Sequence, residues 1–214
     1  MITFYHAPWS RGSSILWLLE ELGAPYEIEQ IDIRAEGGVP ESYRAIQPNK
    51  KVPAIRHDGA VITERAAISI HLADAFPQAG LAPAIGDPMR GPYLTTTVYS
   101  DSVFDPALSA HAQGFSYTSN QFPFGLFDDM VAYVERILTE RRFAAGDRFT
   151  AADTQLGMGI HYTMEMMKAL PRRPAFEDYL ARIVDRPAFK SAQAKDMEMA
   201  RSVPFFAAEF EKAG

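Results

Sequence analysis

The chain of 214 residues contains no cysteine. This absence excludes a disulfide framework, a cysteine-rich zinc site and a catalytic cysteine. Long hydrophobic runs are missing as well, because no stretch approaches the roughly 20 apolar residues that a membrane-spanning helix needs. The first residues, MITFYHAPW, lack the charged start and apolar core of a signal peptide. We therefore expect a soluble cytoplasmic protein that does not bind membranes.

Positive charge is also in short supply. The chain carries 21 lysines and arginines against 27 aspartates and glutamates, a formal net charge of −6. This balance argues against nucleic acid as the main partner. The five histidines lack metal-ligand spacing, and no zinc-protease motif, glycine-rich phosphate loop or serine-hydrolase elbow occurs, so we predict no metal. The hydrophobic fraction of 47% is sufficient for an ordinary globular core.

The stretch from Asn49 to Phe76 organises the N-terminal part of the chain. Its pattern predicts a strand, a tight turn, a second strand and a helix. Asp58-Gly59 marks a two-residue hairpin turn, because glycine adopts positive φ at no steric cost. Thr63 is expected to cap a helix that opens with Glu64-Arg65. The apolar face of this helix is expected to contain Ala67, Ile68, Leu72 and Ala75.

Pro53 lies at the beginning of this hairpin. A proline has no N–H to donate to a sheet, so it belongs at a strand start, an edge or a bulge. The backbone of Val52 is then left unpaired and can accept an extended peptide by strand addition. One hairpin away, the free N–H groups at the helix start suit a carboxylate. The basic residues of this half form either an anion site or ordinary solvated charge. They are Arg11, Lys50, Lys51 and Arg65.

The residues before this stretch have a strand–helix–strand pattern. Within about thirty residues, such a pattern implies two parallel strands joined by a right-handed crossover. Gly23 lies where a helix ends in the left-handed conformation. With the hairpin and its helix, the order becomes βαβ-α-ββα, a thioredoxin-like α/β domain. The expected elements are a strand at Ile2–Tyr5, a helix over residues 13–22, a strand at Tyr26–Ile33 and a short helix at Ser42–Ile46.

The rest of the chain is expected to form an all-α domain. Residues 78–88 are rich in proline, glycine and alanine, which predicts a linker between a domain of residues 1–77 and one of residues 89–214. Pro106 should kink or break the first helix near Phe104-Asp105. In the segment FTAAD, Thr150 and Asp153 have the spacing of a capping box. The expected helices are Met89–His111, Phe124–Arg142, Thr150–Lys168, Pro174–Val184 and Pro187–Met199.

Two segments, Val52-Pro53-Ala54-Ile55 and Thr63-Glu64-Arg65-Ala66-Ala67-Ile68, resemble the glutathione-binding half of the cytosolic glutathione transferases. With the linker and the FTAAD segment, the resemblance covers essentially the whole chain. It is a resemblance to the bacterial type with a serine in the thiol-activating loop. It implies a cis Val52–Pro53 bond and glutathione as co-substrate. It also implies a homodimer, with the N-terminal domain of one subunit against the helical domain of the other.

The resemblance assigns binding roles to individual residues. The backbone of Val52, before Pro53, is expected to pair with the cysteinyl part of glutathione. Glu64 matches the acidic residue that holds the γ-glutamyl end. Arg65 replaces the usual hydroxyl residue, and its guanidinium can still bind a carboxylate as a charged fork. Lys51 either holds the glycyl carboxylate or is a surface lysine.

Ser10, in the loop before the first helix, is the candidate that activates the thiol. Its hydroxyl is expected to donate a hydrogen bond to the glutathione sulfur. Together with the helix N-terminus and the nearby Arg11, it should lower the thiol pKa below its usual value of about 8.5. Tyr5 is the alternative, since some classes of the family use a tyrosine near the end of the first strand. Ser13 and Ser14 also compete with Ser10, which would then only cap the helix.

Three functions stay open on these grounds. The first is conjugation of the glutathione thiolate to small hydrophobic electrophiles, a detoxification reaction. The second is a non-catalytic binding or regulatory protein, which Arg65 favours. The third is a glutathione-dependent isomerase, dehalogenase or peroxidase, which would differ from the first in the pocket for the second substrate. Candidates for lining that pocket are Tyr93, Tyr99, Phe104, His111, Phe115, Tyr162, Met166 and Met167.

Overall fold

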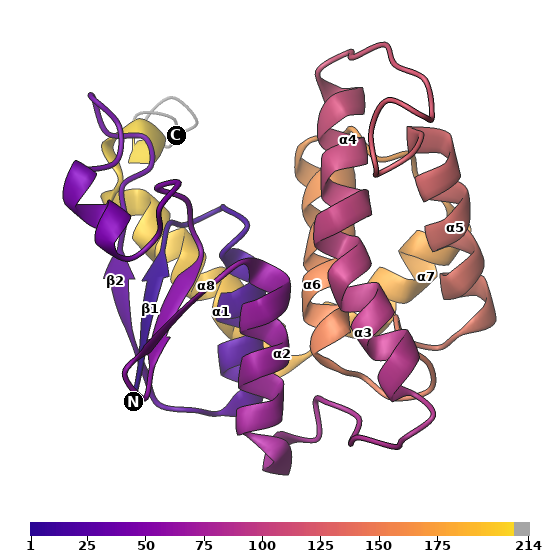
Figure 1. Cartoon of the computed structure of the whole chain (residues 1–214), viewed down its shortest axis with the longest axis horizontal. Helices are drawn as coiled ribbons and strands as arrows, with labels where there is room; N and C mark the ends of the chain where they lie inside the picture. Colours follow the sequence, from indigo (N-terminus) through magenta and orange to yellow (C-terminus); the bar gives the residue numbers. More distant parts are fainter. Residues whose placement is uncertain (208–214) are drawn as a thin grey trace. The chain divides into compact units, whose positions relative to one another are not determined.

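The computed structural model describes residues 1–207, and the chain divides into two compact units (Figure 1). The first unit contains residues 1–71 together with the residues from 186 onward, and the second contains residues 72–185. The C-terminal helix α8 (Pro187–Ser202) joins the first unit because it packs along α1 (Ser13–Leu22). The division into residues 1–77, 78–88 and 89–214 that composition suggests stays a prediction.

The first unit is built on a four-stranded sheet with the strand order β2-β1-β3-β4. Strands β1 and β2 are parallel, while β3 pairs antiparallel with both β1 and β4. The parallel pair is joined through α1, as a right-handed crossover requires. This thioredoxin-like order, followed by helices, confirms the predicted fold class. The strands are β1 (Ile2–His6), β2 (Tyr26–Gln30), β3 (Ala54–His57) and β4 (Ala60–Thr63), with a 3-10 turn η1 (Glu41–Ala45) before β3.

Helix α1 is buried along nearly its whole length. Trp17 is fully buried and meets Phe189 of α8 edge-on, with the ring centroids 4.9 Å apart. Gly23 ends the helix with φ 60°, so the predicted left-handed cap is confirmed. Burial on several sides explains why the apolar residues of α1 extend beyond one stripe. In Figure 1, α8 runs beside α1 although the two helices come from opposite ends of the chain.

Two boundaries in this unit differ from the sequence prediction. Helix α2 (Arg65–Ala75) begins one residue later than expected, and the predicted cap, Thr63, is instead the last residue of β4. The sheet decides this, because Thr63 is held opposite Ala54 in the ladder. Strand β2 ends at Gln30, and not at Ile33, because the Asp32 carboxylate accepts the N–H of Arg34 at 2.8 Å and turns the chain.

The second unit is helical. A π-helical turn at Ser100–Phe104 interrupts the α-helical pattern between its first two helices just before Pro106, so the predicted irregularity at this position is confirmed. The capping box at the start of α6 is confirmed as well, because the Asp153 carboxylate accepts the Thr150 N–H at 2.8 Å. The helices of this unit are α3 (Arg90–Tyr99), α4 (Asp105–Ala112), α5 (Phe127–Glu140), α6 (Ala151–His161) and α7 (Pro174–Ile183), with short turns at Pro77–Ala79 and Tyr162–Met166.

No helix within residues 1–207 combines the length and the apolar character that crossing a bilayer demands.

Candidate functional site

One end of the sheet gathers three segments that are far apart in the sequence. Tyr5, Ala54 and Thr63 occupy the same row of strands β1, β3 and β4. Because neighbouring strands lie about 4.8 Å apart, the chain just beyond this row is brought within roughly 10 Å on all three strands. Those adjoining segments are the loop after β1, the Val52-Pro53 pair before β3, and Glu64 after β4.

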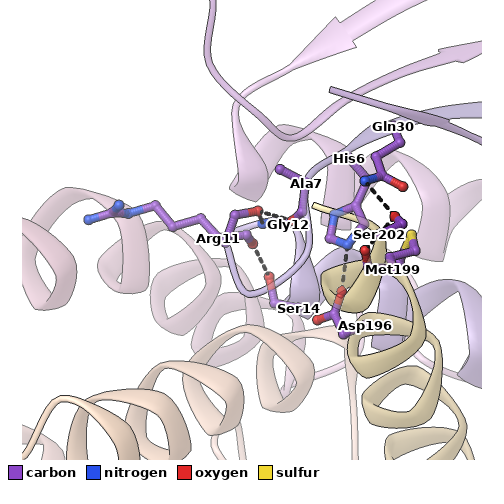
Figure 2. Close-up of polar contacts among 10 residues, drawn as sticks. His6, Ala7, Arg11, Gly12, Ser14, Gln30, Asp196, Met199 and Ser202 are labelled. Atoms are coloured by element: carbon purple, nitrogen blue, oxygen red, sulfur yellow. Dashed lines mark hydrogen bonds and ion pairs between the residues drawn. The ribbon is translucent and has the colours of Figure 1, made fainter. Parts of the chain in front are cut away.

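The loop after β1 is closed by the side chain of Ser10. Its Oγ donates to the carbonyl oxygen of Ala7 at 2.7 Å and accepts the N–H of Gly12 at 3.0 Å. A second hydroxyl, on Ser14, donates to the carbonyl of Arg11 at 3.1 Å (Figure 2). Ser10 is partly buried and Arg11 is exposed. The serine therefore sits just before the N-terminus of α1, where its hydroxyl shapes the turn.

Two residues at this end have backbone conformations that are unusual for their type. Trp9 has φ 53° and Glu64 has φ 66°, both in the left-handed region that favours glycine. Non-glycine residues in this region cost about 1–3 kcal/mol each, and they cluster at ligand sites. Trp9 precedes Ser10 directly, and Glu64 precedes the first residue of α2. The strained positions thus flank the same end of the sheet from two different strands.

The segment before β3 offers unused main chain. The peptide bond between Val52 and Pro53 is cis. Among residues 1–207, the described hydrogen bonds include none to the backbone of Val52. The neighbouring backbone of Lys51 is held by the Gln47 side chain at 3.0 Å and by the Tyr43 hydroxyl at 3.2 Å. This anchoring keeps the unpaired backbone of Val52 in place next to the serine loop.

Lys50 and Lys51 differ in what their ammonium groups do. The Lys50 Nζ lies 2.9 Å from the Val39 carbonyl oxygen and 2.6 Å from a Glu41 carboxylate oxygen, so it holds the loop together. Arg44 and Lys50 together lower the pKa of the Glu41 carboxyl to about 2. Lys51 is exposed, and within the described residues its ammonium forms no ion pair. Of the two lysines, Lys51 is the one whose charge remains for a ligand.

Known proteins are similar to this chain in sequence and fold. The family model for the N-terminal domain of glutathione S-transferases matches residues 8–75, which contain Ser10, Val52 and Glu64. Glutathione S-transferase 3 of Schizosaccharomyces pombe is 27% identical over 214 aligned residues, which cover 91% of this chain and 88% of the relative. The structure of a sphingomonad glutathione S-transferase complexed with glutathione is 27% identical, with a TM-score of 0.72, and covers 91% of this chain and 98% of that one. Residues 8–75 thus match the N-terminal domain of glutathione S-transferases, and the chain as a whole is similar to members of that family.

A further solved structure shares the fold at lower identity. BphK, a bacterial glutathione S-transferase, is 22% identical and has a TM-score of 0.75, covering 91% of this chain and 98% of its own. The fold is thus retained where most residues have changed. The roles of individual residues must therefore be argued from their own geometry.

Tyr5 is buried in the core of the first unit. It is only 4% exposed and packs in a buried cluster with Val39, Tyr43 and Ala54. The rings of Tyr5 and Tyr43 lie 5.8 Å apart, and burial raises the pKa of Tyr43 above its usual range. The geometry therefore favours Ser10 over Tyr5 for the thiol, and both assignments stay predictions.

The two residues at the start of α2 differ in exposure. Glu64 is exposed, and within the described residues no group pairs with its carboxylate. Arg65 is only 8% exposed and has partners inside the chain. The predicted anchoring of a carboxylate by Arg65 would compete with those partners, whereas the exposed carboxylate of Glu64 is available to a ligand amine. Both binding roles stay predictions.

The residues predicted to line a second pocket fall into two groups. Tyr93 and Phe104 are buried in the helical unit, at 0% and 3% exposure, and act as core. Five others are exposed and remain candidates, and Tyr99 is half-buried between the two groups; the five are His111, Phe115, Tyr162, Met166 and Met167. Over residues 1–207, histidine, aspartate and glutamate side chains form no group of three that could hold a metal ion.

The sequence patterns did not predict one feature next to Ser10. His6, the last residue of β1, is fully buried and its Nε2 lies 2.7 Å from the Asp196 carboxylate on α8. The two residues are 190 positions apart, so no local pattern could join them. The only available signal was the isolated polar residue at the end of an apolar strand.

Proposed function

We propose that this chain is a glutathione transferase that conjugates the glutathione thiolate to small hydrophobic electrophiles. The observation that carries the proposal is the juxtaposition of the Ser10 loop, the unpaired backbone of Val52 and the exposed carboxylate of Glu64 at one end of the sheet. Main chain for an extended peptide, a carboxylate for its amino group and a hydroxyl for its thiol are what glutathione requires.

Activation of the thiol would follow from three local features. The Ser10 hydroxyl would exchange the Ala7 carbonyl for the sulfur as its acceptor, while the Gly12 N–H keeps holding Oγ. The N-terminus of α1 adds a positive dipole end, and Arg11 adds a positive charge. All three favour the thiolate, so its proton leaves to solvent. The sulfur lone pair then forms the C–S bond, and the electron pair of the broken bond leaves with the displaced group of the electrophile.

The proposal predicts that the bound thiol ionises more easily than the free thiol. Adding glutathione to the protein over a pH series should produce an ultraviolet thiolate band with an apparent pKa clearly below the free value of about 8.5. S-methylglutathione, which carries no thiol, is the matched control. It should bind in calorimetry and displace glutathione without producing the band.

Two outcomes would contradict the catalytic proposal. Glutathione binding without a thiolate band would favour the non-catalytic binding protein, for which the buried Arg65 in place of the usual hydroxyl residue is the supporting observation. No binding at millimolar glutathione would refute both functions and indicate a different ligand.

We further propose that two copies of the chain form a homodimer, as the family resemblance implies. Sedimentation equilibrium at micromolar concentration should then give twice the chain mass of 23.8 kDa. A stable species at the mass of one chain would refute the dimer and leave the glutathione site unaffected, because every residue of that site comes from one chain.

A further inference from the structure

A buried pair lies directly beneath the serine loop. His6 ends β1 and Asp196 belongs to α8, and their side chains are 0% and 2% exposed. The distance of 2.7 Å from His6 Nε2 to Asp196 Oδ1 is that of a strong hydrogen bond. Figure 2 shows the two side chains joined by this bond beside the loop of Ala7, Arg11 and Gly12.

The carboxylate determines where the hydrogen of His6 lies. An ionised aspartate can only accept hydrogen bonds, so Nε2 must carry the hydrogen, and a neutral ring then keeps a bare lone pair on Nδ1. Within residues 1–207, this Nδ1 is buried and has no hydrogen-bond partner. Buried polar atoms without a partner are uncommon and ask for an explanation.

The unpartnered nitrogen faces the backbone that holds Ser10. A Cβ added to Gly12 would lie 2.3 Å from His6 Nδ1 and 3.1 Å from Ser10 Oγ. The ring and the serine hydroxyl therefore border the same glycine, whose N–H donates to Ser10 Oγ at 3.0 Å. Any side chain at position 12, or a hydrogen projecting from Nδ1 toward it, would push this turn away from the ring.

We propose that His6 and Asp196 are positioning residues for Ser10. Asp196 keeps the hydrogen of His6 on Nε2, and the hydrogen-free Nδ1 side of the ring is the surface on which the turn of Ser10 and Gly12 closes. A hydrogen on Nδ1 would project toward Gly12 and crowd the turn that the Gly12 N–H and Ser10 Oγ hold together. The catalytic part of this inference rests on the proposed function of Ser10, whereas the ordering of the turn does not.

The test compares Asp196→Asn with Lys195→Gln. An asparagine keeps the size of the side chain, but its amide can donate to Nε2 and thereby move the hydrogen to Nδ1. Lys195 is the neighbouring residue on α8, and its Nζ contacts Glu20 at 2.6 Å and the Tyr26 hydroxyl at 2.8 Å, away from the loop. Its loss disturbs the same helix without touching His6.

Three measurements test the proposal, at the His6 ring, at the Gly12 amide and in the reaction. Nitrogen-15 NMR should show hydrogen only on Nε2 of His6 in the wild-type protein and on Nδ1 in part of the Asp196→Asn molecules. The Gly12 amide should exchange with solvent about tenfold faster in Asp196→Asn, the factor that corresponds to losing one ordinary hydrogen bond. With glutathione as substrate, kcat should fall by a similar factor while KM for glutathione changes less than about twofold, because the backbone and carboxylate that bind the peptide are intact.

Several results would overturn the positioning role of His6 and Asp196. Hydrogen on Nδ1 of the wild-type protein would overturn the proposal without any variant, which covers the case of an Asp196→Asn protein that does not fold. Unchanged Gly12 exchange in a folded Asp196→Asn protein, or the same kcat loss in Lys195→Gln, would also overturn it. If the wild-type protein neither binds nor turns over glutathione, the proposed function fails, and the NMR and exchange readings still test the pair.

Discussion

Replacing Asp153 by asparagine is expected to lower the free energy of unfolding by about 3–5 kcal/mol, because hydrogen bonds to a charged acceptor contribute about 1.5–3 kcal/mol each and two or more of them would be lost. The fully buried carboxylate accepts the N–H of Ala144 at 2.7 Å, the N–H and hydroxyl of Thr150 at 2.8 and 3.1 Å, and the Tyr179 hydroxyl at 2.9 Å. An asparagine side chain offers only one acceptor oxygen. Its NH₂ group, which can only donate, would face N–H and O–H groups that also donate.

The same residue should give stability a specific pH dependence. Burial raises the pKa of Asp153 to about 6, although the hydrogen bonds from Ala144, Thr150 and Tyr179 oppose the rise. Between the ordinary value of 3.8 and about 6, the folded protein therefore binds more protons than the unfolded chain. The contribution of Asp153 to stability falls as pH rises through this window. The deficit of the asparagine variant should accordingly be larger near pH 4 than near pH 7.

Urea unfolding of the two proteins at several pH values measures both effects. Asp178→Asn is the matched control. It makes the same chemical change as Asp153→Asn, but at an exposed position next to Tyr179. It should alter stability by less than about 0.5 kcal/mol. If the free energy of unfolding of Asp153→Asn lies within about 1 kcal/mol of the wild-type value, the carboxylate is not the acceptor that joins Ala144, Thr150 and Tyr179.

Removing the hydroxyl of Ser10 is the second large effect that we expect. Ser10→Ala should lower kcat with glutathione by about 10- to 100-fold, because the thiolate loses a hydrogen bond from the only side chain that we assign to it. The apparent pKa of the bound thiol should rise toward about 8.5. KM for glutathione should change little, since the backbone of Val52 and the carboxylate of Glu64 are untouched. Steady-state kinetics and the thiolate band measure these quantities.

Neighbouring hydroxyls provide the controls for Ser10. Ser14 Oγ donates to the Arg11 carbonyl, so Ser14→Ala removes a hydroxyl from the same region without removing the proposed donor. Ser10→Thr keeps a hydroxyl and should retain most of the activity if the oxygen, and not merely the turn, is what matters. A full loss of turnover in Ser13→Ala or Tyr5→Phe, with Ser10→Ala active, would transfer the role to one of those residues.

Several features of this protein were determined within a few residues of sequence. The left-handed end of α1 at Gly23, the Asp58-Gly59 turn, the helix irregularity before Pro106 and the capping box of Thr150 and Asp153 all appear as predicted. Each depends on backbone geometry or on hydrogen bonds between residues at most four apart, and that information is contained in the local sequence. The fold class followed from the order of these elements and from the family motifs.

The tertiary structure decided what depends on distant partners. The register of β4 against β3 moved the start of α2 past Thr63, and packing on α1 brought α8 into the first unit. The same packing placed Asp196 against His6 from 190 positions away, and the packing of the sheet buried Tyr5 to 4% exposure. These outcomes depend on which surfaces bury each other. A sequence pattern indicates that a face is apolar, but only the packed chain determines which face it meets.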